Sequence, residues 1–191
     1  MSDFPYPPQP GQVLPGRDPR APLRGGLASS LGLLLGSALV GLAGGFAWGQ
    51  FAPRVSYVLV SRGSADVVNP ETTAFIVGDA WYCLVAVIGG AVIGLAGYLL
   101  AVRRYGPAPM AAVLIGSVVA GFIARAVGQG MGLSQFNSAL LTSRPGAVLH
   151  APPVLGADPS TILWSAIAFW PLAACLVAGG LLVLAAMRSS R

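Results

Sequence analysis

Four long apolar runs dominate this sequence, and they allow few folds. They cover about residues 27–51, 75–102, 109–130 and 162–187. A helix needs about 20 predominantly apolar residues to cross the hydrocarbon core of a bilayer, and each run is long enough. Charged residues make up only 9% of the chain, whereas a soluble domain carries about 25%. The sequence therefore predicts an all-α membrane protein built as a bundle of four transmembrane helices.

The segments outside these runs differ in character. Residues 1–24 are rich in proline, which has no N–H and interrupts regular structure, so we expect a disordered cytoplasmic tail in front of a transmembrane domain at 25–191. Residues 55–68 have β-branched stretches on either side of Arg62-Gly63-Ser64, a pattern that predicts a short extracytoplasmic β-hairpin between the first and second helices. Residues 131–160 form a longer outer loop between the third and fourth helices, in which we expect one or two helical turns at 134–142.

The distribution of arginine predicts the orientation in the membrane. The tail, the 103–108 loop and the C-terminus carry Arg17, Arg20, Arg24, Arg103, Arg104, Arg188 and Arg191. The two other loops carry Arg54, Arg62 and Arg144. Basic residues accumulate on the cytoplasmic side of membrane proteins. We therefore expect a multi-pass protein of the plasma membrane with both termini in the cytoplasm.

Small residues recur at intervals of four in three of the four runs. The sets are Ser37, Gly41, Gly45 and Gly49; Ala86, Gly90 and Gly94; and Ala112, Gly116, Ala120, Ala124, Gly128 and Gly132. Residues four apart share one helix face, and small residues let helix backbones approach closely in lipid. The sequence predicts that these faces pack mainly within the chain. They also offer a surface for a membrane-protein partner or for homo-oligomerisation.

Two ionisable residues lie inside the apolar runs, Asp79 and Arg125. Asp79 follows the start of the second run by about one turn, and Arg125 precedes the end of the third run by a similar distance. Both are therefore expected near the outer interface at similar depth, and we predict that they form an ion pair of structural or functional importance. Glu71 is a candidate polar group on the outer face. The four tryptophans, Trp48, Trp81, Trp164 and Trp170, are expected at the outer interface, where tryptophan is enriched.

Catalytic and metal-binding patterns are not found in the sequence. Cys83 and Cys175 lie in apolar runs, where we interpret them as packing residues. The single histidine, His150, lies in a proline-rich loop without a nucleophile beside it. We predict no catalytic residue, no metal site and no cofactor. Nucleic-acid binding is not expected either, because the arginines lie at helix ends and do not form a basic face with interleaved aromatics.

Several short motifs lie at or near the ends of the apolar runs. They are Ala52-Pro53-Arg54, Glu71, Asp79-Ala80-Trp81, Arg103-Arg104, Ala124-Arg125, Ala151-Pro152, Leu155-Gly156-Ala157 and Trp170-Pro171-Leu172. Through these motifs the chain resembles an actinobacterial family of four-span membrane proteins that is known only as a domain of unknown function. The resemblance covers about residues 27–188 and implies the same topology in a Gram-positive plasma membrane. Here the last two motifs are spaced more widely than in the family's pattern, which leaves the start of the fourth helix open.

Three hypotheses about function follow. We favour a non-enzymatic accessory or scaffold protein of the cell envelope, which interacts through its two outer loops. The alternative is a subunit of a small oligomeric transporter or channel, because the two helical hairpins have the same orientation. A third hypothesis is an enzyme that acts on lipid or cell-wall precursors through Glu71, Asp79 and Arg125, although such enzymes normally have a denser polar cluster.

Overall fold

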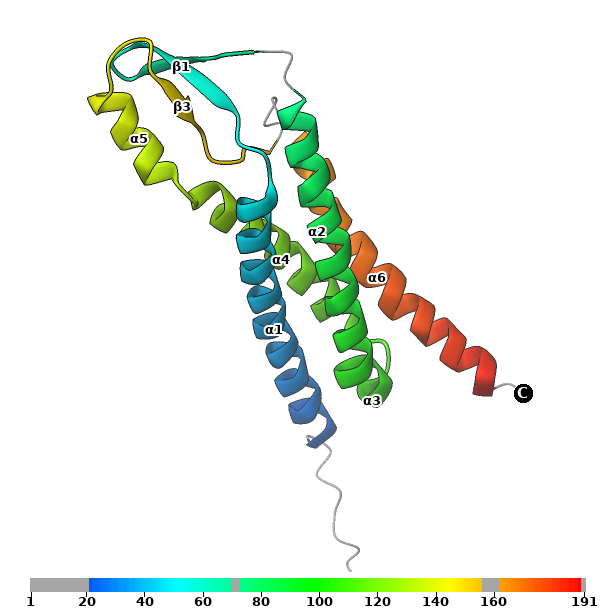
Figure 1. Cartoon of the computed structure of the whole chain (residues 1–191). Helices are drawn as coiled ribbons and strands as arrows, with labels where there is room; N and C mark the ends of the chain where they lie inside the picture. The colour runs from blue at the N-terminus through cyan, green and yellow to red at the C-terminus, as the bar shows by residue number, and fades with distance from the viewer. Residues whose placement is uncertain (1–20, 70–72, 156–161, 190–191) are drawn as a thin grey trace, which may run out of the picture.

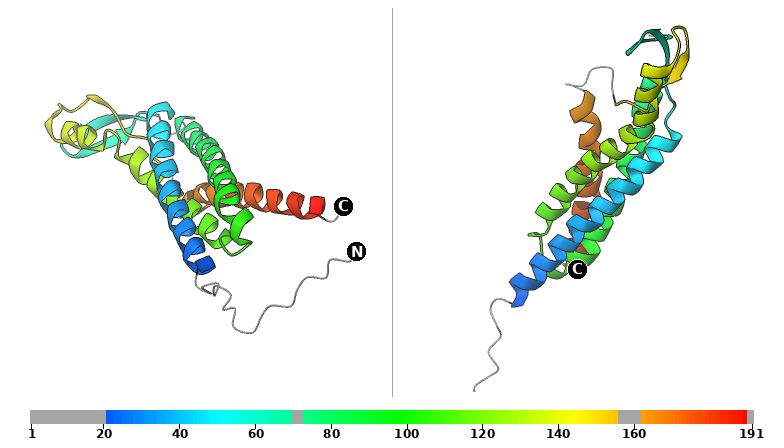
Figure 2. Two further views of the ribbon diagram at one scale, coloured as in Figure 1. Left: turned by 90° about the horizontal axis from the view of Figure 1, so that it is seen from below. Right: turned by 90° about the vertical axis from the view of Figure 1, so that its left-hand side faces the viewer.

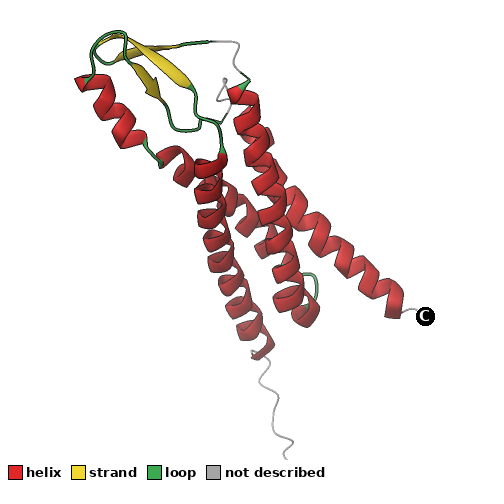
Figure 3. Ribbon diagram, in the orientation of Figure 1, coloured by secondary structure: helices red, strands yellow, loops and turns green. Residues whose placement is uncertain are grey.

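The computed structural model describes residues 21–69, 73–155 and 162–189, and most of these residues are helical. The helical segments are α1 (Ala21–Phe51), α2 (Ala74–Gly97), the π-helical turn η1 (Tyr98–Val102), α3 (Arg103–Tyr105), α4 (Met110–Gly130), α5 (Leu133–Thr142) and α6 (Ile162–Ser189) (Figures 1 and 3). Four of the helices in this part of the chain are long and apolar enough to cross a membrane. This confirms the prediction of a multi-pass helical membrane protein.

The first helix begins earlier than the apolar pattern predicts. The expected span starts at about residue 27, whereas α1 starts at Ala21 and includes Pro22. Proline is tolerated in the first turn of a helix, where its missing N–H would have no partner. The predicted disordered tail covers residues 1–24, but residues 21–24 belong to α1, so the prediction is wrong for these four residues. Residues 1–20 lie outside the described residues.

The two ends of the bundle differ in composition. The start of α1, the α3–α4 turn and the end of α6 lie at one end, which we call the arginine end because Arg103, Arg104 and Arg188 are there (Figure 1). The β-strands and α5 lie at the opposite end, beyond the outer turns of α1 and α2 (Figures 1 and 2). We call this second part, together with residues 151–155, the cap. The start of α1 and the end of α6 thus lie at the same end of the bundle (Figure 1).

The predicted β-hairpin is present, and it is part of a larger sheet. Strand β1 (Ser56–Ser61) pairs with β2 (Ser64–Val67) in antiparallel register, with Tyr57 opposite Val67. Gly63 makes the turn with a φ of +80°, a backbone conformation that favours glycine. The other edge of β1 pairs with β3 (Val148–His150), so the strand order is β2-β1-β3. The loop between α4 and α6 thus completes a sheet that the loop between α1 and α2 begins.

The loop between α4 and α6 is also more helical than the sequence predicts. Its α5 spans 10 residues, nearly three turns, where one or two turns are expected. Gly132 separates α5 from α4 with a φ of +88°, so the chain changes direction there instead of continuing as one helix. The ring of Phe136 on α5 packs edge-on against Tyr57 of β1, with 5.8 Å between the ring centres. This contact fixes α5 beside the sheet.

The small-residue faces of α1 and α4 pack against each other along their length. Gly41 lies against the backbone of Ala120, and Gly45 lies against Ala124. Gly116 faces Ser37 one turn further toward the arginine end, so the two sets meet in the same order along both helices. The helices α1 and α4 therefore run parallel. This confirms the prediction that these faces pack within the chain.

Helices α2 and α6 form a second parallel pair. Gly90 of α2 lies against the backbone of Trp170 and the side chain of Ala173, and Gly94 lies against Ala174. In the described part of α6, the buried small residues are Ala166, Ala174 and Ala178. The bulky Trp170 interrupts their spacing of four, so the sequence of α6 indicates this contact less clearly than that of α4. The bundle thus consists of two hairpins side by side, and each helix has its closest neighbour in the other hairpin.

Candidate functional site

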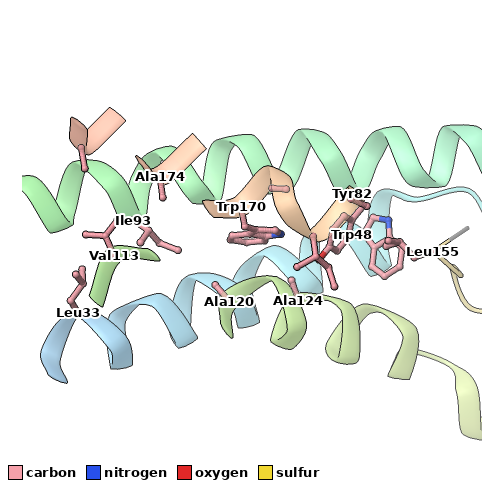
Figure 4. Close-up of a cluster of buried hydrophobic side chains, with 14 of the residues drawn as sticks. Leu33, Trp48, Tyr82, Ile93, Val113, Ala120, Ala124, Leu155, Trp170 and Ala174 are labelled. Carbon is pink, nitrogen blue, oxygen red and sulfur yellow. The ribbon is translucent and has the colours of Figure 1, made fainter. Parts of the chain in front are cut away.

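The middle of the bundle is organised around the indole ring of Trp170. This side chain has no exposed surface, and it lies among glycines of three other helices (Figure 4). A methyl group placed on Gly44 of α1 or on Gly121 of α4 would lie 3.0 Å from the ring, and one on Gly89 of α2 would overlap it. The glycines therefore form the cavity that the ring fills. Trp170 contacts α1, α2 and α4 at once and holds the two hairpins together.

Two further buried aromatics donate hydrogen bonds to backbone carbonyls of neighbouring helices. Nε1 of Trp48 donates to the carbonyl of Gly78 at 2.9 Å, which joins α1 to α2. The hydroxyl of Tyr82 donates to the carbonyl of Gly121 at 2.7 Å, which joins α2 to α4. The rings of Trp48 and Tyr82 pack edge to face, with centres 5.1 Å apart. These contacts set the relative height of three helices.

The expectation that tryptophans mark the outer interface is wrong for two of them. Trp48 and Trp170 are fully buried in the core of the bundle. Trp81 is partly exposed and stacks on Phe51, at 5.8 Å between ring centres. The side chain of Trp164 lies outside the described residues. Neighbouring glycines explain the burial, since Gly89 and Gly121 leave space for the ring of Trp170 and Gly128 leaves space for that of Trp48.

The structure places Asp79 and Arg125 at matching heights. The hydrogen bond between Tyr82 of α2 and Gly121 of α4 marks one level of the bundle. Asp79 lies about one helical turn closer to the cap than Tyr82, and Arg125 lies about one turn closer to the cap than Gly121. Both side chains are half-buried. The two residues thus lie at a similar height in the bundle, and the ion pair between them stays a prediction.

Two buried polar atoms in the described part of the bundle make no hydrogen bond, Nε1 of Trp170 and Nε of Arg125. Both lie beside the same turn of α4, because Cδ1 of Trp170 approaches Gly121 and Arg125 is one turn further along that helix. A buried donor without an acceptor costs about 1–3 kcal/mol. The shape of the glycine cavity sets the position of Trp170.

The remaining candidate residues do not come together as a reactive site in the part of the chain that the structure describes. Glu71 lies outside the described residues. His150 is exposed on the edge strand β3, and Cys83 and Cys175 are free thiols in α2 and α6. Within 21–69, 73–155 and 162–189, no group of His, Cys, Asp or Glu has the spacing to hold a metal ion.

The cap contains a pocket that the sequence does not predict. This cap pocket lies between the sheet and α5 and has a volume of about 390 Å³. Its walls include Tyr57 of β1, Ser64 of β2, Phe136, Asn137 and Leu140 of α5, and Pro152. Small-molecule and side-chain binding pockets commonly have volumes of about 300–1,000 Å³ and apolar walls with a few polar groups. The cap pocket has these properties.

The pocket is held in place by contacts to the bundle. After β3, the N–H of Ala151 donates to the carbonyl of Val55 at 3.0 Å, and Leu155 inserts into the same core cluster as Trp48 and Tyr82 (Figure 4). Leu59 of β1 is also buried, and its backbone bonds to that of Ala147 and Gly146. The wall formed by α5 has a pattern in the sequence, because Leu133, Phe136 and Leu140 are spaced so that they share one face of a helix. The other walls depend on β3, which is too short to have a visible period.

No protein-family model matches this chain, and neither a curated protein nor a solved structure matches it. The function is therefore argued from the chain's own geometry.

Proposed function

We propose that this protein is a non-enzymatic accessory or scaffold protein of the cell envelope, which binds an extracytoplasmic segment of a partner membrane protein in its cap pocket. The observation that carries the proposal is the cap pocket itself. Two loops that are far apart in the sequence fold together around it, and apolar walls surround the side chains of Ser64 and Asn137. Such a pocket suits one or two apolar side chains of a peptide segment, with polar groups at its edge to fix their orientation.

The proposal includes the location and the family. The cap end faces the outside of the plasma membrane, and both termini are cytoplasmic, as the positions of Arg103, Arg104 and Arg188 support. The motifs at the helix ends support membership of the actinobacterial four-span family. The lipid bilayer is then the first partner of the chain, and exposed apolar side chains such as Leu35 and Leu176 provide the surface for it.

The packing of the bundle favours this function over a pore formed by one chain. Trp170 fills the centre between the two hairpins, and Ile93 and Val113 fill the level nearer the arginine end (Figure 4). A transporter or channel would then need a path between several copies. The large apolar side chains on the outer faces of α1 and α6 are better suited to lipid than to water.

Site-specific photo-crosslinking in growing cells tests the proposal. A photoreactive residue at Asn137, which lines the cap pocket, is expected to give one discrete adduct with another membrane protein. The same residue at Ser138, which is exposed on α5 but does not line the pocket, is the matched control and is expected to give none.

A pocket-filling variant makes the test specific. Ser64→Trp is expected to abolish the adduct from Asn137, because the new side chain occupies the pocket. Val60→Trp adds the same side chain at an exposed position of β1 outside the pocket and is expected to leave the adduct unchanged. Equal adducts from positions 137 and 138, or an adduct that persists in Ser64→Trp, would contradict the proposal.

A further inference from the structure

A second pocket lies at the arginine end, on the side of the bundle where α6 diverges from the other helices (Figures 1 and 2). This arginine pocket has a volume of about 430 Å³. It is lined by Tyr98, Arg103, Leu181, Leu184, Ala185 and Arg188. Two arginines and several apolar side chains thus line one pocket, between the end of the second long helix and the end of the last.

The π-helical turn η1 explains why Arg103 is part of this pocket. The N–H of Arg103 donates to the carbonyl of Tyr98, five residues earlier. In a regular α-helix, residues five apart point about 140° away from each other. A π-helical turn has the wider i→i+5 repeat, which brings them onto one face. The turn therefore directs Tyr98 and Arg103 toward α6 together, while Arg104 does not line the pocket.

The opposite wall has an apolar part and a basic part along one helix face. Leu181 and Ala185 are four residues apart on α6, as are Leu184 and Arg188, so the four residues lie along one side of the helix. The distance along the helix from Leu181 to Arg188 is about 10 Å. The part of the pocket nearer the middle of the bundle is apolar, and the part nearer the arginine end has the two positive charges of Arg103 and Arg188. A lipid has the same polarity at a membrane interface, with acyl chains toward the bilayer centre and a phosphate at its edge.

The charges of the pocket select the headgroup. Guanidinium groups bind phosphate oxygens in a bidentate geometry. The carboxylates in the described part of the chain, Asp66 and Asp79, belong to β2 and to the outer part of α2, at the other end of the bundle. Two positive charges facing one phosphodiester favour a lipid with net negative charge over a zwitterionic one. Basic pockets between membrane helices are a known type of site for anionic headgroups.

We propose that the arginine pocket binds an anionic phospholipid, with its phosphate between Arg103 and Arg188 and an acyl chain along Leu181 and Leu184. The lipid fills the angle between η1 and α6 and joins the end of the second membrane helix to the end of the last. This site is independent of the cap pocket, so either proposal stands if the other fails.

The test measures lipid retention by the full chain in a neutral detergent, with native mass spectrometry. We expect phosphatidylglycerol to be retained and phosphatidylcholine to be lost. Arg103→Gln and Arg188→Gln are each expected to weaken phosphatidylglycerol binding about fivefold, the effect of one basic residue near an anionic lipid surface. Arg104→Gln removes the same charge at the adjacent position outside the pocket, and it is the matched control that should bind as the unaltered protein does.

Two additional measurements make the outcome decisive. Ala185→Trp fills the pocket and keeps both arginines, and it is expected to lose binding as well. Glycerol phosphate in solution is expected not to displace the lipid, because it lacks the acyl chain.

Two results would overturn the proposal. An equal loss of phosphatidylglycerol binding in Arg104→Gln would show unspecific charge attraction, and displacement of the lipid by glycerol phosphate would show a free-phosphate site. Arg103 and Arg188 are both exposed near the ends of their helices, so both glutamine variants are expected to fold.

Discussion

Glycines of α1 that look equivalent in the sequence have different roles in the structure. A methyl group on Gly41 would lie 2.6 Å from the carbonyl oxygen of Ala120, whereas a methyl group on Gly36 would meet no atom within 4 Å. The contact at Gly41 is with backbone, which cannot rotate away as a side chain can. Glycine at position 41 is thus required by helix packing, and at position 36 it is not.

We predict that Gly41→Ala lowers the free energy of unfolding by about 1–3 kcal/mol, the usual cost of overpacking a well-packed interior. Gly36→Ala is the control. It should be neutral or stabilising by up to about 1 kcal/mol, because alanine has the higher helix propensity. Thermal or denaturant unfolding in detergent micelles measures both. Equal losses in the two variants would mean that α1 and α4 do not pack as described.

Asp79 and Arg125 provide a second prediction at the level of single residues. If they pair, then Asp79→Asn and Arg125→Gln each leave an unpaired charge in a half-buried position, and each lowers thermal stability in detergent. The double variant should recover part of the loss, with a coupling energy of about 1–3 kcal/mol. Strictly additive losses would show that the two side chains do not interact.

Among the elements, α5 depends most on one backbone position. Gly132 has a φ of +88°, and its conformation turns the chain from α4 into α5. Residues with a side chain lose about 1–2 kcal/mol in the left-handed region. The orientation of α5 therefore depends on Gly132, which precedes the helix. One wall of the cap pocket depends on it too, although Gly132 does not line the pocket.

We predict that Gly132→Ala destabilises the cap by about 1–2 kcal/mol. Hydrogen exchange should increase in α5 and in β1, because Phe136 and Tyr57 lose their contact. Gly130→Ala, two residues earlier, has open space around it and no positive φ, so its exchange should match that of the unaltered protein. A uniform increase throughout the bundle in Gly132→Ala would contradict this local role.

The elements also show which features can be read from a sequence. The four long helices and the β1–β2 hairpin follow from local patterns, namely long apolar runs and β-branched stretches around Gly63. Strand β3 has three residues and exists because β1 offers it a free edge, which local patterns do not reveal. The burial of Trp48 and Trp170 depends on glycines of other helices, so their depth in the bundle is a tertiary property. The cap pocket could not be predicted for both reasons, because it depends on a short strand without a local pattern and on contacts between elements far apart in the sequence.

For the whole molecule, the proposed orientation gives a direct test. A version without Cys83 and Cys175, with single cysteines at Ser64 or Ala147 in the cap, should react with a membrane-impermeant thiol reagent on intact cells. A cysteine at Ser189, at the arginine end, should react only after the membrane is opened. Labelling at position 189 on intact cells would reverse the proposed orientation.

The parallel pairing of α1 with α4 has a consequence for biosynthesis. The ribosome completes α1 first, but Ala120 and Ala124, which receive Gly41 and Gly45, are translated only after the whole of α2. At about 5–20 residues per second, this delay is on the order of several seconds. During this time the glycine face of α1 is in contact with the insertion machinery or with lipid. The glycine face of α2 is likewise without its packing partner until α6 is made, because Gly90 and Gly94 pack against α6. The bundle can therefore close completely only when the last helix has entered the membrane.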